Sequence, residues 1–477
     1  MVKKKFYLTT AIPYVNAHPH AGHALEYVIA DAIHRYHELI GENVRIVSGA
    51  DENALKNIQA AEKAGKPVQK FLDENSKNFA DFYKLLEVEL DEFRRGTDRT
   101  YHWPGVQKLW ELANRAGDIY KKKYKGLYCI GCEEFKTEKD LVDGKCPAHD
   151  RKPETVEEEN YFFKLSSYQD KLLKLIESDA YQIYPEKRKN EVLSFIKSGL
   201  EDFSISRSDE RARGVGVPVP GDPPAGGQNI YVWFDALNIY QTGVGWGYDE
   251  SLWKTWWPAD LHIIGKDIIR FHAVYWPAML LSAKLPLPKT LLVHGFISSG
   301  GRKMSKSLGN VIDPYELIEK YGVESLRYYL LAKIPTLDDG DFTIEGFKKV
   351  YQADLANGLG NLVARVAGLS KNYKLQITNY KLRFSKKVEN YIKSYELNLA
   401  LEEIWKEIRK TDVLINKKGV WNLKGKEKEQ ILTDLVGKVR QIAFDLRPFL
   451  PETAEEIEKR FKGPKIKSGK PLFPRLE

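Results

Sequence analysis

The spacing of apolar residues at the start of the chain predicts a strand, a helix and a second strand. Residues 6–10 and 43–47 read as the strands, and between residues 25 and 33 apolar side chains recur at helical spacing. A strand, a helix and a strand in this order open a parallel α/β domain, so we expect a doubly wound sheet.

The α/β pattern is interrupted from residue 119 to residue 227 and then resumes. Residues 260–265 read as a strand, and the apolar residues that follow fall on one helix face: Ile268, Phe271, Tyr275, Trp276 and Met279. His272 places a polar ring on this face, so it needs either a hydrogen-bond partner in the core or a ligand.

Beyond about residue 350 the apolar spacing is helical throughout and predicts a C-terminal bundle. The expected fold is therefore α/β, a Rossmann-like doubly wound parallel sheet with an inserted connective domain and a C-terminal α-helical bundle. We expect five segments: the first half of the sheet domain (1–118), the insertion (119–227), the second half (228–290), a region with a basic loop (291–350) and the bundle (351–477).

Composition and charge narrow the class of protein. A chain of 477 residues is too long for one core, which suggests roughly three or four domains or subdomains. The 74 Lys and Arg against 66 Asp and Glu give a net charge of +8, which fits a polyanionic partner but does not require one. No apolar run is long enough for a membrane span or a signal peptide, so we expect a cytoplasmic protein without a membrane partner.

All three cysteines lie close together and have metal-ligand spacing. Cys129 and Cys132 are separated by two residues, as are Cys146 and His149. Three thiolates and one imidazole make a closed tetrahedral site for a structural Zn²⁺, with no position open for catalysis. Buried thiols without a metal are the alternative.

Two segments have the chemistry of phosphate binding. Residues 18–23, His-Pro-His-Ala-Gly-His, follow the first strand, where such folds place phosphates against a helix N-terminus. Residues 300–307, Gly-Gly-Arg-Lys-Met-Ser-Lys-Ser, combine flexible glycines with cations that can neutralise departing pyrophosphate. The alternatives are a His-rich surface loop and a solvated basic loop.

Together these segments resemble the His-x-Gly-His and Lys-Met-Ser-Lys-Ser signatures of class I aminoacyl-tRNA synthetases. Further stretches resemble the methionyl-tRNA synthetases within that class, namely residues 159–163, 202–207, 231–236, 264–268, 271–279 and 307–314. The resemblance implies a methionine-tRNA ligase, which activates L-methionine with ATP to methionyl-adenylate and pyrophosphate. It then transfers methionine to the 3′ end of tRNA(Met).

The resemblance implies catalytic roles for His20 and His23, which would contact the ATP phosphates, and for Lys303 and Lys306, which would hold pyrophosphate. Of the two lysines, Lys306 would be the more important. The implied ATP-binding residues are His20, Gly22, His23, Gly265, Asp267 and Lys306. ATP would arrive with Mg²⁺. These groups offer donors or charge where the reaction builds negative charge, so no covalent enzyme intermediate is required.

The resemblance also implies an amino-acid pocket in which Asp51 pairs with the substrate ammonium. Its aromatic and aliphatic walls suit a polarisable thioether. The implied methionine-binding residues are Ala11, Ile12, Tyr14, Asp51, Trp233, Ala236, Leu237, Tyr240, Ile268, Phe271, His272 and Trp276. By spacing alone, those on the helix after residue 265 would be ordinary core, and that alternative stays open.

The chain departs from the family near this pocket. Where the family usually reads Thr-Asp-Glu-His-Gly, residues 50–54 are Ala-Asp-Glu-Asn-Ala. Asn53 can form hydrogen bonds but cannot carry positive charge, and the backbone at Ala54 must accommodate a Cβ. Val215 and Val420 replace residues that are usually Trp and Pro.

In the predicted bundle, Asn361 and Arg365 lie four residues apart on one helix edge, and Trp421 follows a basic loop. They resemble the positions that read the CAU anticodon by hydrogen bonding and stacking. The cysteines and His149 match a one-zinc form of the family's insertion, and residues 291–350 would contact the tRNA stem. The extra C-terminal domain that dimerises some family members is missing, so we expect a monomer.

Three alternative functions compete with this interpretation. A tRNA-binding or regulatory paralogue without aminoacylation activity is disfavoured by the intact His20, His23, Lys303 and Lys306. An enzyme with another acceptor is disfavoured by the anticodon-like residues. A synthetase for leucine, isoleucine or valine is disfavoured because no insertion is large enough for an editing domain; cysteine remains as a further candidate.

Overall fold

The computed structural model describes residues 3–132, 134–136, 138–147, 150–223, 227–304, 310–375 and 382–476. The chain divides into two compact units, each made of separate stretches of sequence. The first unit contains residues 1–19, 42–84 and 89–293, and the second contains residues 20–41, 85–88 and 294–477. The finer division into five segments stays a prediction.

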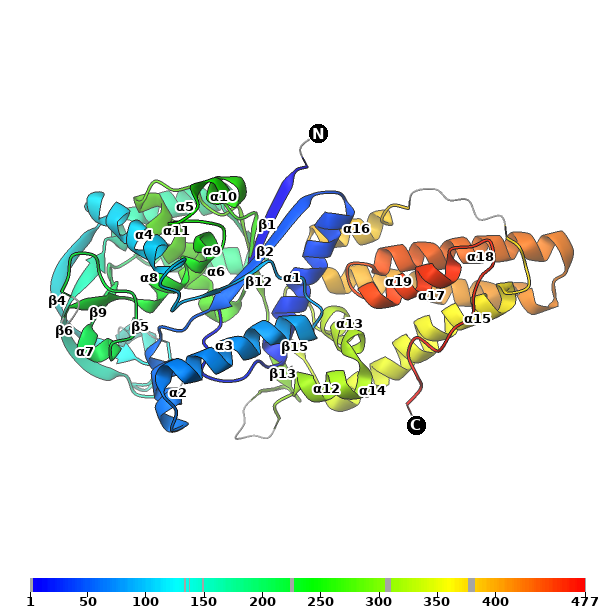
Figure 1. Cartoon of the computed structure of the whole chain (residues 1–477), viewed down its shortest axis with the longest axis horizontal. Helices are drawn as coiled ribbons and strands as arrows, with labels where there is room; N and C mark the ends of the chain where they lie inside the picture. Colours follow the sequence, from blue (N-terminus) through cyan, green and yellow to red (C-terminus); the bar gives the residue numbers. More distant parts are fainter. Residues whose placement is uncertain are drawn as a thin grey trace. The chain divides into compact units, whose positions relative to one another are not determined.

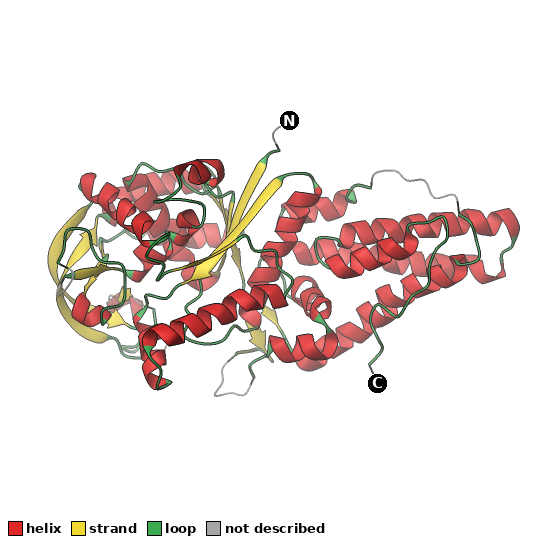
Figure 2. Cartoon of the chain, viewed as in Figure 1, coloured by secondary structure: helices red, strands yellow, loops and turns green. Residues whose placement is uncertain are grey.

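A six-stranded sheet in the order β3-β2-β1-β11-β12-β7 runs through the first unit (Figures 1 and 2). Its strands are β1 (Lys5–Thr10), β2 (Asn43–Ala50), β3 (Glu92–Arg95), β7 (Gln182–Tyr184), β11 (Leu261–Gly265) and β12 (Thr290–His294). The pairs β1–β2, β2–β3, β1–β11 and β12–β7 are parallel. The strand order reverses between β1 and β11, so the predicted doubly wound sheet is confirmed. The strand β7 comes from the stretch predicted as an insertion.

The reversal of strand order fixes where a ligand can bind. Thr10 pairs with Ile263 across β1 and β11, so the residues after Thr10 and those around Gly265 leave the sheet at the same edge. In open α/β sheets, ligands bind outside the carboxyl ends of the strands at this switch point.

The remaining strands of the first unit form two smaller sheets. A four-stranded antiparallel sheet in the order β5-β4-β6-β8 contains β4 (Ile119–Cys129), β5 (Glu134–Lys136), β6 (Glu154–Phe163) and β8 (Phe203–Ser204). A separate pair contains β9 (Ser206–Ser208) and β10 (Gln228–Ile230). The long β4–β6 ladder ends near Cys129, so it positions the first of the clustered cysteines.

Helices connect and cover the strands of the first unit. They are α2 (Leu55–Lys63), α3 (Val68–Leu85), α4 (Trp103–Arg115), α5 (Gln169–Glu177), α6 (Glu186–Lys197), α7 (Asp209–Ala212), α8 (Val232–Ala236), α9 (Ile239–Thr242), α10 (Glu250–Trp256) and α11 (Trp276–Ser282), with the short turns η1 (Glu138–Asp140), η2 (Leu165–Tyr168), η3 (Lys266–Ile268) and η4 (Phe271–Tyr275). The helix predicted after β11 is therefore divided. The turn η4 is π-helical, with the N–H of Trp276 donating to the carbonyl of Phe271, and Pro277 next to it lacks the N–H that a regular helix would use.

The second unit is mainly helical. Its elements are α1 (Ala21–Leu39), β13 (Ile297–Ser299), β14 (Arg302–Lys303), α12 (Pro314–Tyr321), α13 (Val323–Lys333), β15 (Gly340–Asp341), α14 (Ile344–Val350), η6 (Tyr351–Gly360), α15 (Asn361–Ser370), α16 (Lys386–Lys393), α17 (Leu397–Lys418), η7 (Val420–Asn422), α18 (Gly425–Leu446) and α19 (Pro451–Phe461). Helices α15, α17, α18 and α19 pack side by side, which confirms the C-terminal bundle (Figure 1). Among the described helices, none is both long and apolar enough to cross a membrane.

One buried ion pair holds separate stretches of the second unit together. The guanidinium of Arg327, which is 0% exposed, donates to the Asp31 carboxylate of α1 at 2.5 Å. It also donates to the carbonyls of Leu86 and Phe449. These bonds join α13, α1, the segment 85–88 and the turn before α19. A buried guanidinium is costly without acceptors, so the fold must keep these elements together.

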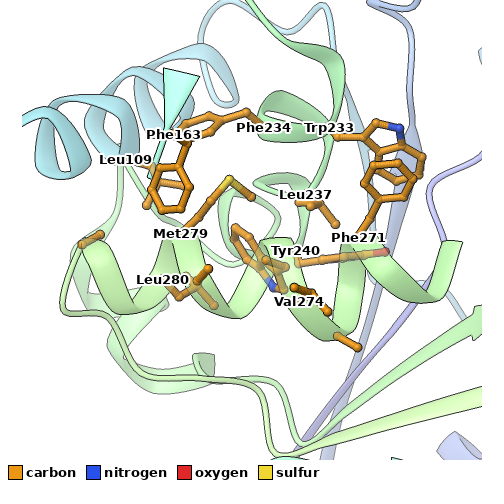
Figure 3. Packing of buried hydrophobic residues seen from close by; sticks show 14 of the residues in the cluster. Leu109, Phe163, Trp233, Phe234, Leu237, Tyr240, Phe271, Val274, Met279 and Leu280 are labelled. Carbon is orange, nitrogen blue, oxygen red and sulfur yellow. The ribbon is translucent and has the colours of Figure 1, made fainter. Parts of the chain in front are cut away.

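The core of the first unit is an apolar cluster that includes Leu237, Tyr240, Phe271 and Met279 (Figure 3). His272, which the sequence pattern had set apart, is a buried polar residue next to Phe271. His272 is 1% exposed, and its Nδ1 lies 3.0 Å from the carbonyl oxygen of Ile268, while its Nε2 lies 2.7 Å from the hydroxyl of Tyr240. A carbonyl only accepts, so Nδ1 carries the proton and the Tyr240 hydroxyl donates to Nε2. Burial lowers the pKa of His272 to about 4, so the ring is neutral.

The buried neutral His272 should make the protein acid-sensitive. As the pH falls from about 6.5 towards 4, the imidazole gains a proton in the unfolded chain but not in the folded one, so the free energy of unfolding decreases. Above pH 6.5 both states are neutral and the effect disappears. Urea unfolding at pH 6.5 and 4.5 should show wild type losing about 2–3 kcal/mol more than His272→Gln. Equal losses in the two proteins would show that His272 protonates equally in both states.

Candidate active site

Aromatic rings from three parts of the first unit meet near the carboxyl edge of the sheet. Trp233 of α8 stacks on Phe271 of η4 with ring centroids 3.8 Å apart and an angle of 6° between the planes (Figure 3). Tyr14, from the loop after β1, meets the edge of Trp233 at 6.1 Å. Tyr240 lies 6.5 Å from Trp276 between ring centroids.

Most of the predicted methionine-binding residues share this neighbourhood. Ile12, Trp233, Leu237, Tyr240, Phe271 and Trp276 belong to one buried apolar cluster, against which Ala11, Tyr14 and Ile268 pack. Ala236 and His272 are buried on the same two segments. The arrangement gives an apolar aromatic site with one polar pair, Tyr240 and His272. The assignment of these residues to methionine stays a prediction.

Asp51 lies where β2 ends, beside this aromatic group. It forms an isolated parallel bridge with Tyr14, and its backbone N–H donates to the carbonyl of Pro13 at 2.9 Å. The side chain of Asn57 donates to the Asp51 carbonyl at 2.8 Å. These bonds fix the backbone of a buried carboxylate next to the loop that follows β1.

The two unusual residues after Asp51 are accommodated by the local structure. Ala54 is fully buried and has φ −85° and ψ 140°, a conformation that any residue adopts, so its Cβ needs no glycine. Asn53 donates from Nδ2 to the Asp235 carboxylate at 2.6 Å and to the carbonyl of Gly96 at 2.9 Å. The sequence did not indicate this partner, because Asp235 lies far away along the chain.

A buried histidine at the N-cap of α4 completes this group. His102 places Nε2 2.6 Å from the other carboxylate oxygen of Asp235 and Nδ1 2.9 Å from the hydroxyl oxygen of Thr242. His102 and Asp235 are residues that the sequence reasoning did not select. The signal available for Asp235 was a carboxylate within the apolar run 230–237, where burial requires a partner.

Gly265 and Asp267 lie where the sequence placed them, at the end of β11. Gly265 is the last residue of that strand and is buried, and Asp267 is exposed in the turn η3. Both therefore lie at the carboxyl edge, Gly265 at the end of the strand next to β1 and Asp267 in the turn that follows it. Their contact with ATP stays a prediction.

In the second unit, His20 and His23 form a capping box at the N-terminus of α1. Nδ1 of His20 accepts from the N–H of Gly22 at 3.1 Å, and Nδ1 of His23 accepts from the N–H of His20 at 3.2 Å. The rings stack with centroids 3.9 Å apart. A Cβ on Gly22 would come within 2.9 Å of the His20 ring, which explains the glycine.

These caps determine what the two rings offer to a ligand. Burial lowers the pKa of His23 well below its usual value, and the neighbouring His20 and His294 lower it further. The ring of His23 is therefore neutral. With Nδ1 accepting a backbone proton, a neutral ring carries its own proton on Nε2. Both histidines in this form have an Nε2–H donor at a helix N-terminus, which favours anions.

His294 is a further histidine of this unit that the sequence reasoning did not select. Its Nδ1 lies 2.8 Å from the carbonyl of Gly295, and its Nε2 lies 3.0 Å from a carboxylate oxygen of Glu26 on α1. A carbonyl only accepts, so Nδ1 of His294 carries a proton and donates it to Gly295, and Nε2 faces the Glu26 carboxylate.

The two glycines of the basic segment form a hairpin turn between β13 and β14. Gly300 and Gly301 have φ of 62° and 70°, the left-handed backbone that the central residues of a type I′ hairpin require. Asp341 accepts from the Gly301 N–H at 2.9 Å and from the Ser298 hydroxyl at 2.7 Å, and these bonds lower its pKa. The hairpin fixes the backbone position of Lys303, the last residue of β14. Lys306 lies outside the described residues.

The predicted metal ligands converge at the four-stranded sheet. The sulfur atoms of Cys129, Cys132 and Cys146 all lie within 4.8 Å of one another, and those of Cys132 and Cys146 are 3.5 Å apart. Thiolates around a tetrahedral Zn²⁺ with Zn–S bonds of about 2.3 Å would be about 3.8 Å apart, so the three positions fit this metal. His149, the fourth predicted ligand, lies outside the described residues.

In the bundle, the structure brings Arg365 and Trp421 together. The guanidinium of Arg365 lies 5.4 Å from the Trp421 ring centroid and donates to Asp412 at 2.8 Å and to Asn416 at 2.5 Å. Asn361 is exposed one turn earlier on α15. Trp421 is 50% exposed, so it is not a core residue.

Val420, at the departure from the family, is buried beside this exposed ring. Gly419 ends α17 in the left-handed conformation, and the next residue enters the turn η7. The chain therefore anchors the turn with an aliphatic side chain in place of a proline. Nothing in the structure explains the change at Val215.

Comparisons with known proteins agree with this geometry. A family model described as tRNA synthetases class I (M) matches residues 6–152 and 138–367. The methionine–tRNA ligase of Clostridium acetobutylicum is 40% identical over an alignment that covers 100% of this chain and 79% of the relative. That of Nostoc sp. is 41% identical over 95% of this chain and 89% of the relative.

A solved structure extends the similarity to three dimensions. Mycobacterium tuberculosis methionyl-tRNA synthetase in complex with methionyl-adenylate matches with a TM-score of 0.90 and 38% identity, covering 99% of this chain and 100% of the other. Matches of this extent leave no large part of the chain unaccounted for. The chain therefore belongs to the class I tRNA synthetases of the methionine type, the family of the methionine–tRNA ligases.

Proposed function

We propose that the site at the carboxyl edge of the sheet carries out the ligase reaction of this family on L-methionine, ATP and tRNA(Met). The observation that supports this most is the match along 99% of the chain to a synthetase that holds methionyl-adenylate. The aromatic group around Trp233 and the adjoining Asp51 supply the two kinds of contact that a methionine molecule needs.

The first contact is apolar and would hold the thioether. Stacked Trp233 and Phe271, with the aliphatic residues around them, offer polarisable surface to a sulfur atom. The Tyr240 hydroxyl donates to Nε2 of the neutral His272, so the Tyr240 oxygen is held at a fixed point of the wall. The second contact is ionic, because the Asp51 carboxylate would accept from the substrate ammonium.

Adenylate formation needs donors rather than a nucleophile from the protein. A methionine carboxylate oxygen forms a bond with the α-phosphorus of ATP, and the bond from that phosphorus to the bridging oxygen breaks to release pyrophosphate. The Nε2–H groups of His20 and His23 would donate to phosphate oxygens, and Lys303 and Lys306 would neutralise the leaving pyrophosphate. Mg²⁺ bound to ATP would offset charge on the same oxygens.

The second step passes methionine to the tRNA. A hydroxyl at the 3′ end of tRNA(Met) attacks the adenylate carbonyl, an ester bond forms, and AMP leaves. The bundle would recognise the anticodon through Asn361, Arg365 and Trp421. We expect the chain to act as a cytoplasmic monomer.

Methionine-dependent ATP–pyrophosphate exchange tests the proposed substrate. Exchange should be fastest with methionine among methionine, leucine, isoleucine, valine and cysteine. Asp51→Asn should raise KM for methionine by at least tenfold and leave KM for ATP nearly unchanged, because only the ammonium loses a charged partner. Faster exchange with another of these amino acids would reject methionine as the substrate.

Metal analysis tests the structural zinc. Purified protein should contain one Zn²⁺ per chain. Cys146→Ala should lose the metal and have a lower melting temperature, because metal binding stabilises the segment that holds the three cysteines. Lys145→Ala, next to the ligand but with its side chain paired to Asp150, should keep the metal. Folded wild-type protein without zinc would refute the assignment.

Trp421→Ala tests anticodon recognition. Loss of a stacking ring, typically worth about 1–3 kcal/mol per base, should reduce charging of tRNA with a CAU anticodon by about 5- to 150-fold. Methionine-dependent exchange and melting temperature should stay close to wild type, because the ring is half exposed. Trp421→Phe should restore most of the charging. Parallel loss of charging, exchange and thermal stability would instead make Trp421 a structural residue.

A further inference from the structure

Asp235 is a buried carboxylate in the middle of a predicted substrate-binding helix. It is 1% exposed, and its neighbours on α8 include Trp233 and Ala236, both assigned to the methionine pocket. A buried carboxylate is costly unless donors surround it. The bonds to Asp235 should therefore be strong determinants of where α8 lies.

Two donors from distant segments hold the two carboxylate oxygens. Oδ2 accepts from Nδ2 of Asn53 at 2.6 Å, and Oδ1 lies 2.6 Å from Nε2 of His102. Nδ2 of Asn53 also donates to the Gly96 carbonyl, so both of its protons are used. This pairing fixes the amide orientation, because exchanging its oxygen and nitrogen would place an acceptor against two acceptors.

The same group also reaches the second pocket helix. Nδ1 of His102 lies 2.9 Å from the hydroxyl oxygen of Thr242 on α9, two residues after Tyr240. The short helices α8 and α9 are thus tied to α4 and to the segment after β2. Four of the predicted methionine-binding residues are on these two helices or between them: Trp233, Ala236, Leu237 and Tyr240.

The Asn53–Asp235 bond spans the two ends of the proposed substrate. Asn53 follows Asp51, the proposed ammonium partner, by two residues, and Asp235 follows Trp233, a proposed side-chain contact, by two residues. The bond therefore fixes the distance between the part of the site that holds the ammonium and the part that holds the thioether.

We propose that Asn53 is a positioning residue that sets the length of the methionine pocket through Asp235, with His102 holding the other carboxylate oxygen. The inference rests on the proposed function of this pocket. A pocket held at fixed length rejects a side chain longer by one methylene, a discrimination worth about 10- to 200-fold in kcat/KM. Freeing α8 from Asn53 removes that constraint.

The experiment compares methionine with ethionine, which is one methylene longer beyond the sulfur, in pyrophosphate exchange. Asn53→Leu keeps the side-chain size but removes both donors. It should lower kcat/KM for methionine by about tenfold, mainly through KM, and lower that for ethionine by less than threefold, while KM for ATP stays the same. The preference for methionine over ethionine should therefore fall at least threefold.

Asn160→Leu is the matched control. Asn160 is a fully buried asparagine of the same unit whose Nδ2 donates to the Glu158 carboxylate at 3.1 Å, within the four-stranded sheet. This variant should keep the wild-type preference even if its melting temperature falls. If Asn53→Leu does not fold, Asn53→Gln serves instead, because it keeps the donor but displaces it by one methylene and should lower the preference in the same way.

Equal losses with both amino acids, or an unchanged preference, would overturn the role of Asn53 and leave methionine activation by the wild type intact. Failure of the proposed function gives a different result, because the wild type itself would then show no methionine-dependent exchange.

Discussion

The parallel pairing of β1 with β11 is the contact on which the rest of the first unit depends. These strands are about 250 residues apart in sequence, and Asp260 starts their alignment. Its backbone N–H donates to the Tyr7 carbonyl at 2.7 Å, and its side chain accepts from the Tyr7 N–H at 2.8 Å. Once this register is set, the loop after Thr10 and the turn after Gly265 must leave the sheet together, and the residues that follow both strands meet at one edge.

Buried polar groups give the pocket at this edge its definite shape. An apolar cluster alone tolerates repacking, whereas a buried hydrogen bond has a required distance and direction. The side chains of Thr9 and His262 are 2.6 Å apart across the β1–β11 pair, and the ring of His262 lies 4.4 Å from that of Tyr240. Burial lowers the pKa of His262 well below its usual value, and the neighbouring His272 lowers it further. The wall of the site therefore carries no imidazolium charge at His262.

The sequence predicted the elements and motifs whose signal is local. The period of the apolar residues located the strands at the switch point, and the glycine-histidine and cysteine spacings located two groups that the structure brings together. Contacts between distant segments had no such signal. Nothing near Asn53 indicates Asp235, and nothing near residue 182 indicates that β7 would join the central sheet. The π-helical turn at Phe271 was also missed, because its apolar spacing resembles that of an ordinary helix and only Pro277 marks the change.

The start of α1 shows how one pair of side chains can serve the fold and a ligand together. Helix caps are usually Ser, Thr, Asp or Asn, whose oxygens accept the backbone protons that the helix leaves unpaired. Here the Nδ1 atoms of His20 and His23 do this. A carboxylate cap would bring negative charge that repels phosphate, whereas a neutral imidazole accepts on one side and donates on the other. The helix N-terminus is therefore satisfied without losing its attraction for anions, and the same bonds that satisfy it select the tautomer that a phosphate needs.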